Sequence, residues 1–95
     1  MPQSVGKITN IKVGSFLQES VNAFDIGTVT LHETATNADW VFYLWVTRAD
    51  APALQRVLQT QRLALVREAA FRNRVVHLWH QIDSSVVDEI QVDIA

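Results

Sequence analysis

The sequence of 95 residues has no cysteine, only two prolines and three glycines, and no long apolar run. Without cysteine the chain forms no disulfide and supports no thiolate chemistry. The longest strongly apolar block covers residues 40–46, whereas a membrane-spanning helix needs about 20 residues. The first residues also lack the apolar segment of a secretory signal. These absences predict a soluble protein, most simply a cytoplasmic one with no membrane partner.

Motifs of catalysis are missing as well. The three glycines are scattered and form no phosphate-binding loop, and there is no Gly-x-Ser-x-Gly motif. His77 and His80 stand three residues apart, and on a strand this spacing places them on opposite faces, where they cannot share a metal. The carboxylates of Asp88, Glu89 and Asp93 also fall on mixed faces. We therefore expect no enzyme, no catalytic residues, no metal site and no cofactor.

Charge is distributed unevenly along the chain. The net charge of −2 argues against a general binder of polyanions. Residues 51–81 carry five arginines against one glutamate, whereas residues 82–95 carry four acidic side chains and no basic one. Basic and acidic segments of this kind can pair within one fold or between two copies of the chain.

The sequence does contain enough apolar material for one folded domain. Hydrophobic residues make up 48% of the chain, and no repeat, low-complexity tract or linker divides it. Residues 1–95 are therefore expected to form a single domain. A domain of this size buries only roughly 60–65% of its unfolded surface, so self-association is one way for it to gain stability.

Five segments have the composition and alternation of β-strands. They cover residues 6–13, 26–34, 40–47, 75–82 and 86–94. In the first segment the apolar phase slips near Thr9 and Asn10, which predicts a β-bulge. The second and third segments are expected to form a hairpin around a turn at residues 35–39.

Two further expectations concern the ends and faces of these strands. Gly14 is expected to end the first strand, and residues 15–25 to form a loop whose apolar side chains pack on the core. Those side chains are Phe16, Leu17, Val21 and Phe24. The third strand is apolar on both faces, which predicts burial on both and leaves open which phase faces the core.

A single helix is predicted over residues 51–72, which are mostly alanine, leucine, glutamine and arginine. Asp50 is a suitable N-cap, and Pro52 is tolerated in the first turn. An alternative is a change to strand at Leu63, so the sequence leaves residues 63–71 open between helix and strand.

The predicted helix has two apolar stripes. One stripe, expected to close the core, contains Leu54, Leu58, Leu65 and Ala69; the other contains Leu63, Val66 and Ala70. A helix that is apolar on two sides needs two partners. One is the sheet, and the other is a further surface that another protein or a second copy can supply.

The order β-β-β-α-β-β, the opening Gly6-Lys7-Ile8 and the passage from Ala69 to Val76 resemble the OB-fold. OB-folds are five-stranded, partly open barrels. The resemblance covers essentially the whole chain and implies a mainly β, OB-like barrel with one helix between the third and fourth strands. It also implies a ligand face on the second and third strands, because OB-folds stack the bases of single-stranded nucleic acid there.

Aromatic and histidine side chains supply the candidate ligand or interaction face. If the second and third strands pair, His32, Tyr43 and Trp45 are expected on one surface, to which Trp79 of the fourth strand can add. Aromatic side chains in such a group can stack on a flat ligand or anchor a protein partner.

Three arginines form a candidate basic helix face. Arg56, Arg67 and Arg74 recur at spacings of 11 and 7 residues, which can place them along one side of a helix. Phosphate groups would suit such a face. Residues 26–47, by contrast, contain no lysine or arginine, which disfavours nucleic-acid binding on those strands.

Two functions follow from these features. The first is a noncatalytic binding protein that acts through protein contacts, including self-association into a homo-oligomer. The second is a binder of single-stranded nucleic acid or a small ligand on the aromatic face of the second and third strands.

Overall fold

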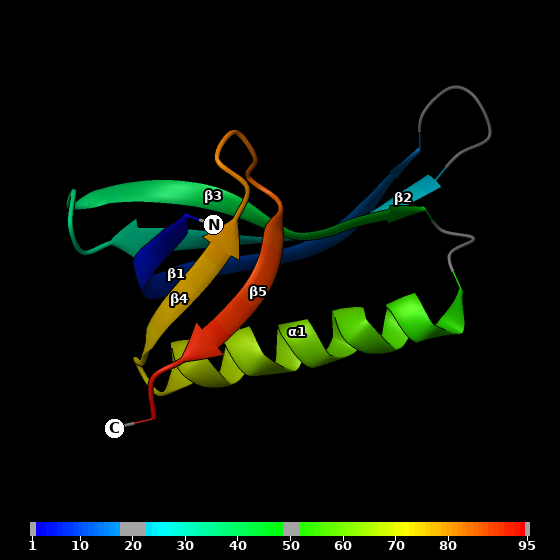
Figure 1. Cartoon of the computed structure of the whole chain (residues 1–95). Helices are drawn as coiled ribbons and strands as arrows, with labels where there is room; N and C mark the ends of the chain where they lie inside the picture. The colour runs from blue at the N-terminus through cyan, green and yellow to red at the C-terminus, as the bar shows by residue number, and fades with distance from the viewer. Residues whose placement is uncertain (1, 18–22, 49–51, 95) are drawn as a thin grey trace.

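The computed structural model describes residues 2–17, 23–48 and 52–94. Within them the chain has the predicted order β-β-β-α-β-β, and all its strands lie in one antiparallel sheet (Figure 1). The elements are β1 (Gln3–Leu17), β2 (Ala23–Glu33), β3 (Ala38–Arg48), α1 (Ala53–Phe71), β4 (Val75–His80) and β5 (Val87–Val92). The strands are arranged in the order β3-β2-β1-β4-β5, and α1 runs along one side of the sheet (Figure 1).

The sheet is not closed into a barrel, so the prediction of a barrel is wrong. In the described part of the chain, the edge strands β3 and β5 meet only at an isolated bridge between Tyr43 and Val86. Beside this bridge the guanidinium of Arg62 donates to the carbonyls of Leu44 in β3 and Val87 in β5, at 2.8 Å each. These carbonyls bond to a side chain of α1 and are not available to pair the two strands.

β1 and β2 extend beyond their predicted ends. Gly14 does not end β1, because it pairs with Ile26 and the ladder continues to the pair of Leu17 and Ala23. Most of the expected loop at residues 15–25 is therefore strand. Of the residues predicted to pack there, Val21 lies outside the described residues, and the structure describes only the backbone of Phe16, Leu17 and Phe24.

Other boundaries differ less from the prediction. The predicted bulge in β1 is confirmed by a register shift between Ile8 and Asn10. The hairpin of β2 and β3 is also confirmed, with a tighter turn at residues 34–37. Asn37 adopts a positive φ of 55° in this turn, a conformation that asparagine tolerates better than most residues. β4 and β5 are both shorter than predicted.

β3 buries one face, and the prediction of burial on both is wrong. Phe42 and Leu44 are buried, whereas Val41 is 56% and Tyr43 37% exposed. A register shift in the pairing of β2 and β3 then brings Trp45 to the core side as well, where it is 8% exposed. The alternation of the sequence does not reveal this change of face, because the shift lies within a run of apolar residues.

Trp45 needs the absence of a side chain on its neighbour Gly27 in β2. A Cβ atom on Gly27 would come within 2.6 Å of the indole ring, so the ring lies where only glycine leaves room for it. The core that results comprises Ile8, Val29, Leu31, Phe42, Leu44, Trp45, Val66, Ala69, Val76, Leu78 and Val87.

α1 is one continuous helix, which identifies residues 63–71 as helical. Pro52 takes the N-cap position, and its carbonyl accepts the Gln55 N–H at 3.0 Å. Asp50, the expected N-cap, lies outside the described part. Val66 and Ala69 are the buried residues of α1.

The leucine stripe of α1 does not close the core, contrary to the prediction. Leu54 is 70%, Leu58 48% and Leu65 40% exposed. The helix turns the side of Val66 and Ala69 toward the sheet, so the leucines fall on its flank. The sequence does not distinguish the two stripes, because both are equally apolar.

The difference in burial predicts that Trp45 contributes more to the free energy of unfolding than Leu58 does. Trp45→Ala is expected to lower the free energy of unfolding by about 3–5 kcal/mol, because it removes a buried aromatic side chain. Leu58→Ala is expected to cost about 1 kcal/mol or less, because nearly half of this side chain is already in water. Urea unfolding of both variants measures the difference, and equal losses would contradict this assignment of the core.

Candidate functional site

The outer face of the sheet, opposite the core, gathers basic, polar and aromatic side chains from three strands. The pairing register forms the rows Lys12–Thr28–Tyr43 and Lys7–His32–Asp39 across β1, β2 and β3. Both lysines are exposed. Neighbouring strands lie about 4.8 Å apart, so each row brings a cation close to the polar and aromatic groups of β2 and β3.

Lys7 and Lys12 were not among the site residues predicted from the sequence. β2 and β3 carry no lysine or arginine in residues 26–47, but β1 supplies Lys7 and Lys12 to the same face. The predicted bulge of β1 is the signal that could have found them, since it keeps Ile8 and Ile11 on the core side and turns the lysines outward.

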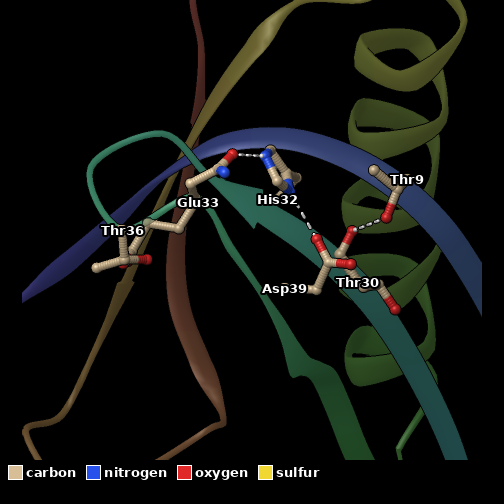
Figure 2. Close-up of polar contacts among 7 residues, drawn as sticks. Thr9, Thr30, His32, Glu33, Thr36 and Asp39 are labelled. Atoms are coloured by element: carbon tan, nitrogen blue, oxygen red, sulfur yellow. Dashed lines mark hydrogen bonds and ion pairs between the residues drawn. The ribbon is translucent and has the colours of Figure 1, made fainter.

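His32 is held by two oxygen acceptors of the β2–β3 hairpin. Its Nδ1 donates to the Asp39 carboxylate at 2.7 Å and its Nε2 to the side-chain carbonyl of Asn37 at 2.9 Å. Figure 2 shows the ring beside Asp39, with a dashed line between the two side chains. Both ring nitrogens carry a proton only in the charged form. The hydrogen bond to Asp39, and after it the one to Asn37, therefore raises the pKa of His32 above its ordinary value of 6.5.

The four residues of the predicted ligand face do not form one surface. His32 and Tyr43 lie on the outer face, whereas Trp45 is buried in the core. Trp79 pairs with Gln3 at the beginning of β1, away from the row of Tyr43. There its ring stacks on that of His77, with the ring centroids 5.8 Å apart.

Two of the three arginines predicted to share a helix face lie on α1, and the third does not. Arg56 forms an ion pair with Asp25 at 3.2 Å, Arg67 is exposed on α1, and Arg74 follows the end of α1. Arg62, which the sequence did not single out, donates to three backbone carbonyls. Arg56 and Arg67, 11 residues apart, lie on the same side of α1, whereas Arg74 is outside the helix.

α1 carries an exposed apolar stripe, called here the α1 stripe. It consists of Leu54, Val57, Leu58 and Leu65, which are 40–70% exposed. A cavity of about 310 Å³ adjoins it between α1 and β5, lined by Leu65, Glu68, Ala69, Arg72, Arg74, Val92, Asp93 and Ile94. The apolar residues of this lining offer surface that a partner could bury, and basic and acidic residues lie beside them.

Other kinds of site find little support in the described part of the chain. No group of three or more histidine, cysteine, aspartate or glutamate side chains gathers there in a way that could hold a metal ion. No helix found there has the length and hydropathy needed to cross a membrane. Comparison of the chain with protein-family models, curated proteins and solved structures gives no match.

The raised pKa of His32 predicts a pH-dependent hairpin. The stability that charged His32 contributes is fully present below its unfolded pKa of 6.5, and it is lost as the pH rises through the raised folded pKa. Thermal unfolding from about pH 6 to about pH 9 should therefore show a fall in Tm that His32→Gln reduces. A fall of the same size in the variant would show that these hydrogen bonds do not stabilise the fold.

Proposed function

We propose that this protein is a binding module that acts through protein contacts, including contacts with a second copy of itself. The observation that carries the proposal is the α1 stripe. Four large apolar side chains lie along one flank of a regular helix and remain 40–70% exposed. Contiguous exposed apolar surface of this kind marks interaction sites, whereas scattered apolar residues do not.

A second copy suits the α1 stripe for a geometric reason. Two identical helices related by a two-fold axis present the same stripe to each other, so the surface need only be self-complementary. Leu58 lies between Leu54 and Leu65 on the stripe, and pairing it with the same region of the partner buries all three leucines. Burial of apolar area then supplies the driving force.

We infer an OB-type arrangement of strands in which the sheet stays open at the seam of β3 and β5. The strand order β3-β2-β1-β4-β5 supports this, because a parallel contact between its two edge strands is the one that would close such a sheet into a barrel. The bridge between Tyr43 and Val86 is parallel, and the Tyr43 N–H donates to the Ser85 carbonyl at 2.8 Å.

Sedimentation velocity tests self-association through the α1 stripe. The double variant Leu54→Gln/Leu58→Gln should raise the dimer dissociation constant by about tenfold or more, because it removes apolar anchors from the interface. Thr60→Gln changes an exposed residue on another side of α1 and should leave the constant unchanged. A wild-type protein that stays monomeric at about 100 μM would contradict the proposal.

A second candidate function is binding of single-stranded nucleic acid or another anionic ligand to the outer face. The observation that favours it is the register that places Lys12 and Thr28 beside Tyr43, and Lys7 beside His32. Lysines on the same face as an aromatic ring are the combination used for single strands, where cations attract phosphate and rings stack on bases.

Fluorescence anisotropy of a labelled oligonucleotide tests this candidate. Binding at low salt should weaken as salt rises. Tyr43→Ala should weaken it by about tenfold through lost stacking, and Lys12→Ala should reduce its salt dependence. Lys12 and Tyr43 are exposed, so both variants should fold. Absence of binding at low salt, or equal binding by all three proteins, would exclude this use of the outer face.

A further inference from the structure

A second cavity, of about 320 Å³, lies at the end of the sheet where β1 and β3 begin and β4 ends. Ser4 and His80 line it together with the aromatic rings of Trp40 and Phe42. Its volume lies within the range of small-molecule sites. The outer face and the α1 stripe do not include any of these four residues, so the cavity is separate from the surfaces described above.

Ser4 and His80 form a hydrogen-bonded pair in this cavity. The Ser4 Oγ lies 3.1 Å from the His80 Nε2, and the His80 Nδ1 lies 2.9 Å from the carbonyl oxygen of Gln81. A carbonyl oxygen only accepts, so Nδ1 carries the proton and donates it to Gln81. In the neutral ring Nε2 is then an acceptor, and the Ser4 hydroxyl donates to it.

Packing fixes this arrangement from two sides. Ser4 is 8% exposed and is the one buried polar residue among those described. The ring of Phe42 packs against that of His80, with the centroids 5.2 Å apart, and the His80 backbone N–H donates to the Pro2 carbonyl at 3.1 Å. A hydroxyl, a base within hydrogen-bond reach and a third group that orients the base together form the arrangement that activates a nucleophile.

We propose that Ser4 is a nucleophile that accepts an acyl group from a small ester, with His80 as its general base. The Ser4 Oγ attacks the ester carbonyl carbon while its proton passes to the His80 Nε2. The tetrahedral intermediate expels the alcohol, which takes that proton as the carbon–oxygen bond breaks. The acyl group remains on Ser4 as an ester, and His80 returns to its neutral form, so atoms and charge balance.

The lining of the cavity defines the class of ester. Trp40 and Phe42 supply apolar walls that suit a short acyl chain or an aromatic leaving group. Glu33 and Asp83 also line the cavity, and their carboxylates repel anionic esters. Neutral esters are therefore the preferred acyl donors. This inference is independent of the binding function proposed above.

Reaction with p-nitrophenyl acetate, a small neutral ester with an aromatic leaving group, tests the proposal. The wild-type protein should release p-nitrophenol in a burst and gain one acetyl group, which peptide mass spectrometry should place on Ser4. His80→Gln should slow acetylation of Ser4 by about 100-fold or more, since it removes the base. Ser4→Ala should abolish the burst.

Controls separate this outcome from surface acetylation and from unfolding. Thr60→Ala removes an exposed hydroxyl of α1 that does not line the cavity and should leave acetylation of Ser4 unchanged. Thermal unfolding of each variant shows whether it is folded, and the mapping of acetyl groups on the wild-type protein does not depend on any variant. Acetyl groups found only on lysines or histidines, or an unchanged rate in His80→Gln, would overturn the proposal.

Discussion

The fold depends on the guanidinium of Arg62, which joins α1 to the two edge strands β3 and β5. The guanidinium extends from α1 to the carbonyls of Leu44 in β3 and of Val87 and Asp88 in β5. Buried carbonyls without a donor are costly, and the two edge strands separate at this point. One charged side chain with several donors in a fixed plane satisfies them together. The same contacts hold α1 against the seam, where neither strand continues the ladder.

The open seam also explains why apolar surface remains uncovered. In a closed barrel the two edge strands would bond to each other, and the helix would only cover one end. Here Arg62 faces the seam, so α1 presents Val66 and Ala69 to the core and its leucine flank to solvent. The exposed flank is therefore a consequence of how the sheet is held, and the helix sequence remains consistent with it because both of its stripes are apolar.

The local pattern of residues predicted the order of the elements, whereas the pairing register between strands determined which side chains share a face. The element order, the β1 bulge and the hairpin follow from alternation and turn residues, which are local properties. Trp45 was assigned to a ligand face because the shift that buries it leaves no trace in an apolar run. Lys12 was overlooked because its place beside Tyr43 depends on the pairing of two strands. Ser4 and His80 are separated by 76 residues, so no motif of neighbouring residues could indicate their contact.

The pairing of β1 with β4 also affects the order in which the sheet can form during synthesis of the chain. The first residues of β1 pair with β4, and the pair of Gln3 and Trp79 is among the most distant in the sequence. β1, β2 and β3 can assemble as a meander while the chain is still being synthesised, but β4 is completed only after α1 has emerged. Until then one side of the central strand has free backbone groups, and such an edge readily pairs with another chain. Once β4 has been synthesised, its pairing with β1 occupies this edge and removes it as a site for pairing with another chain.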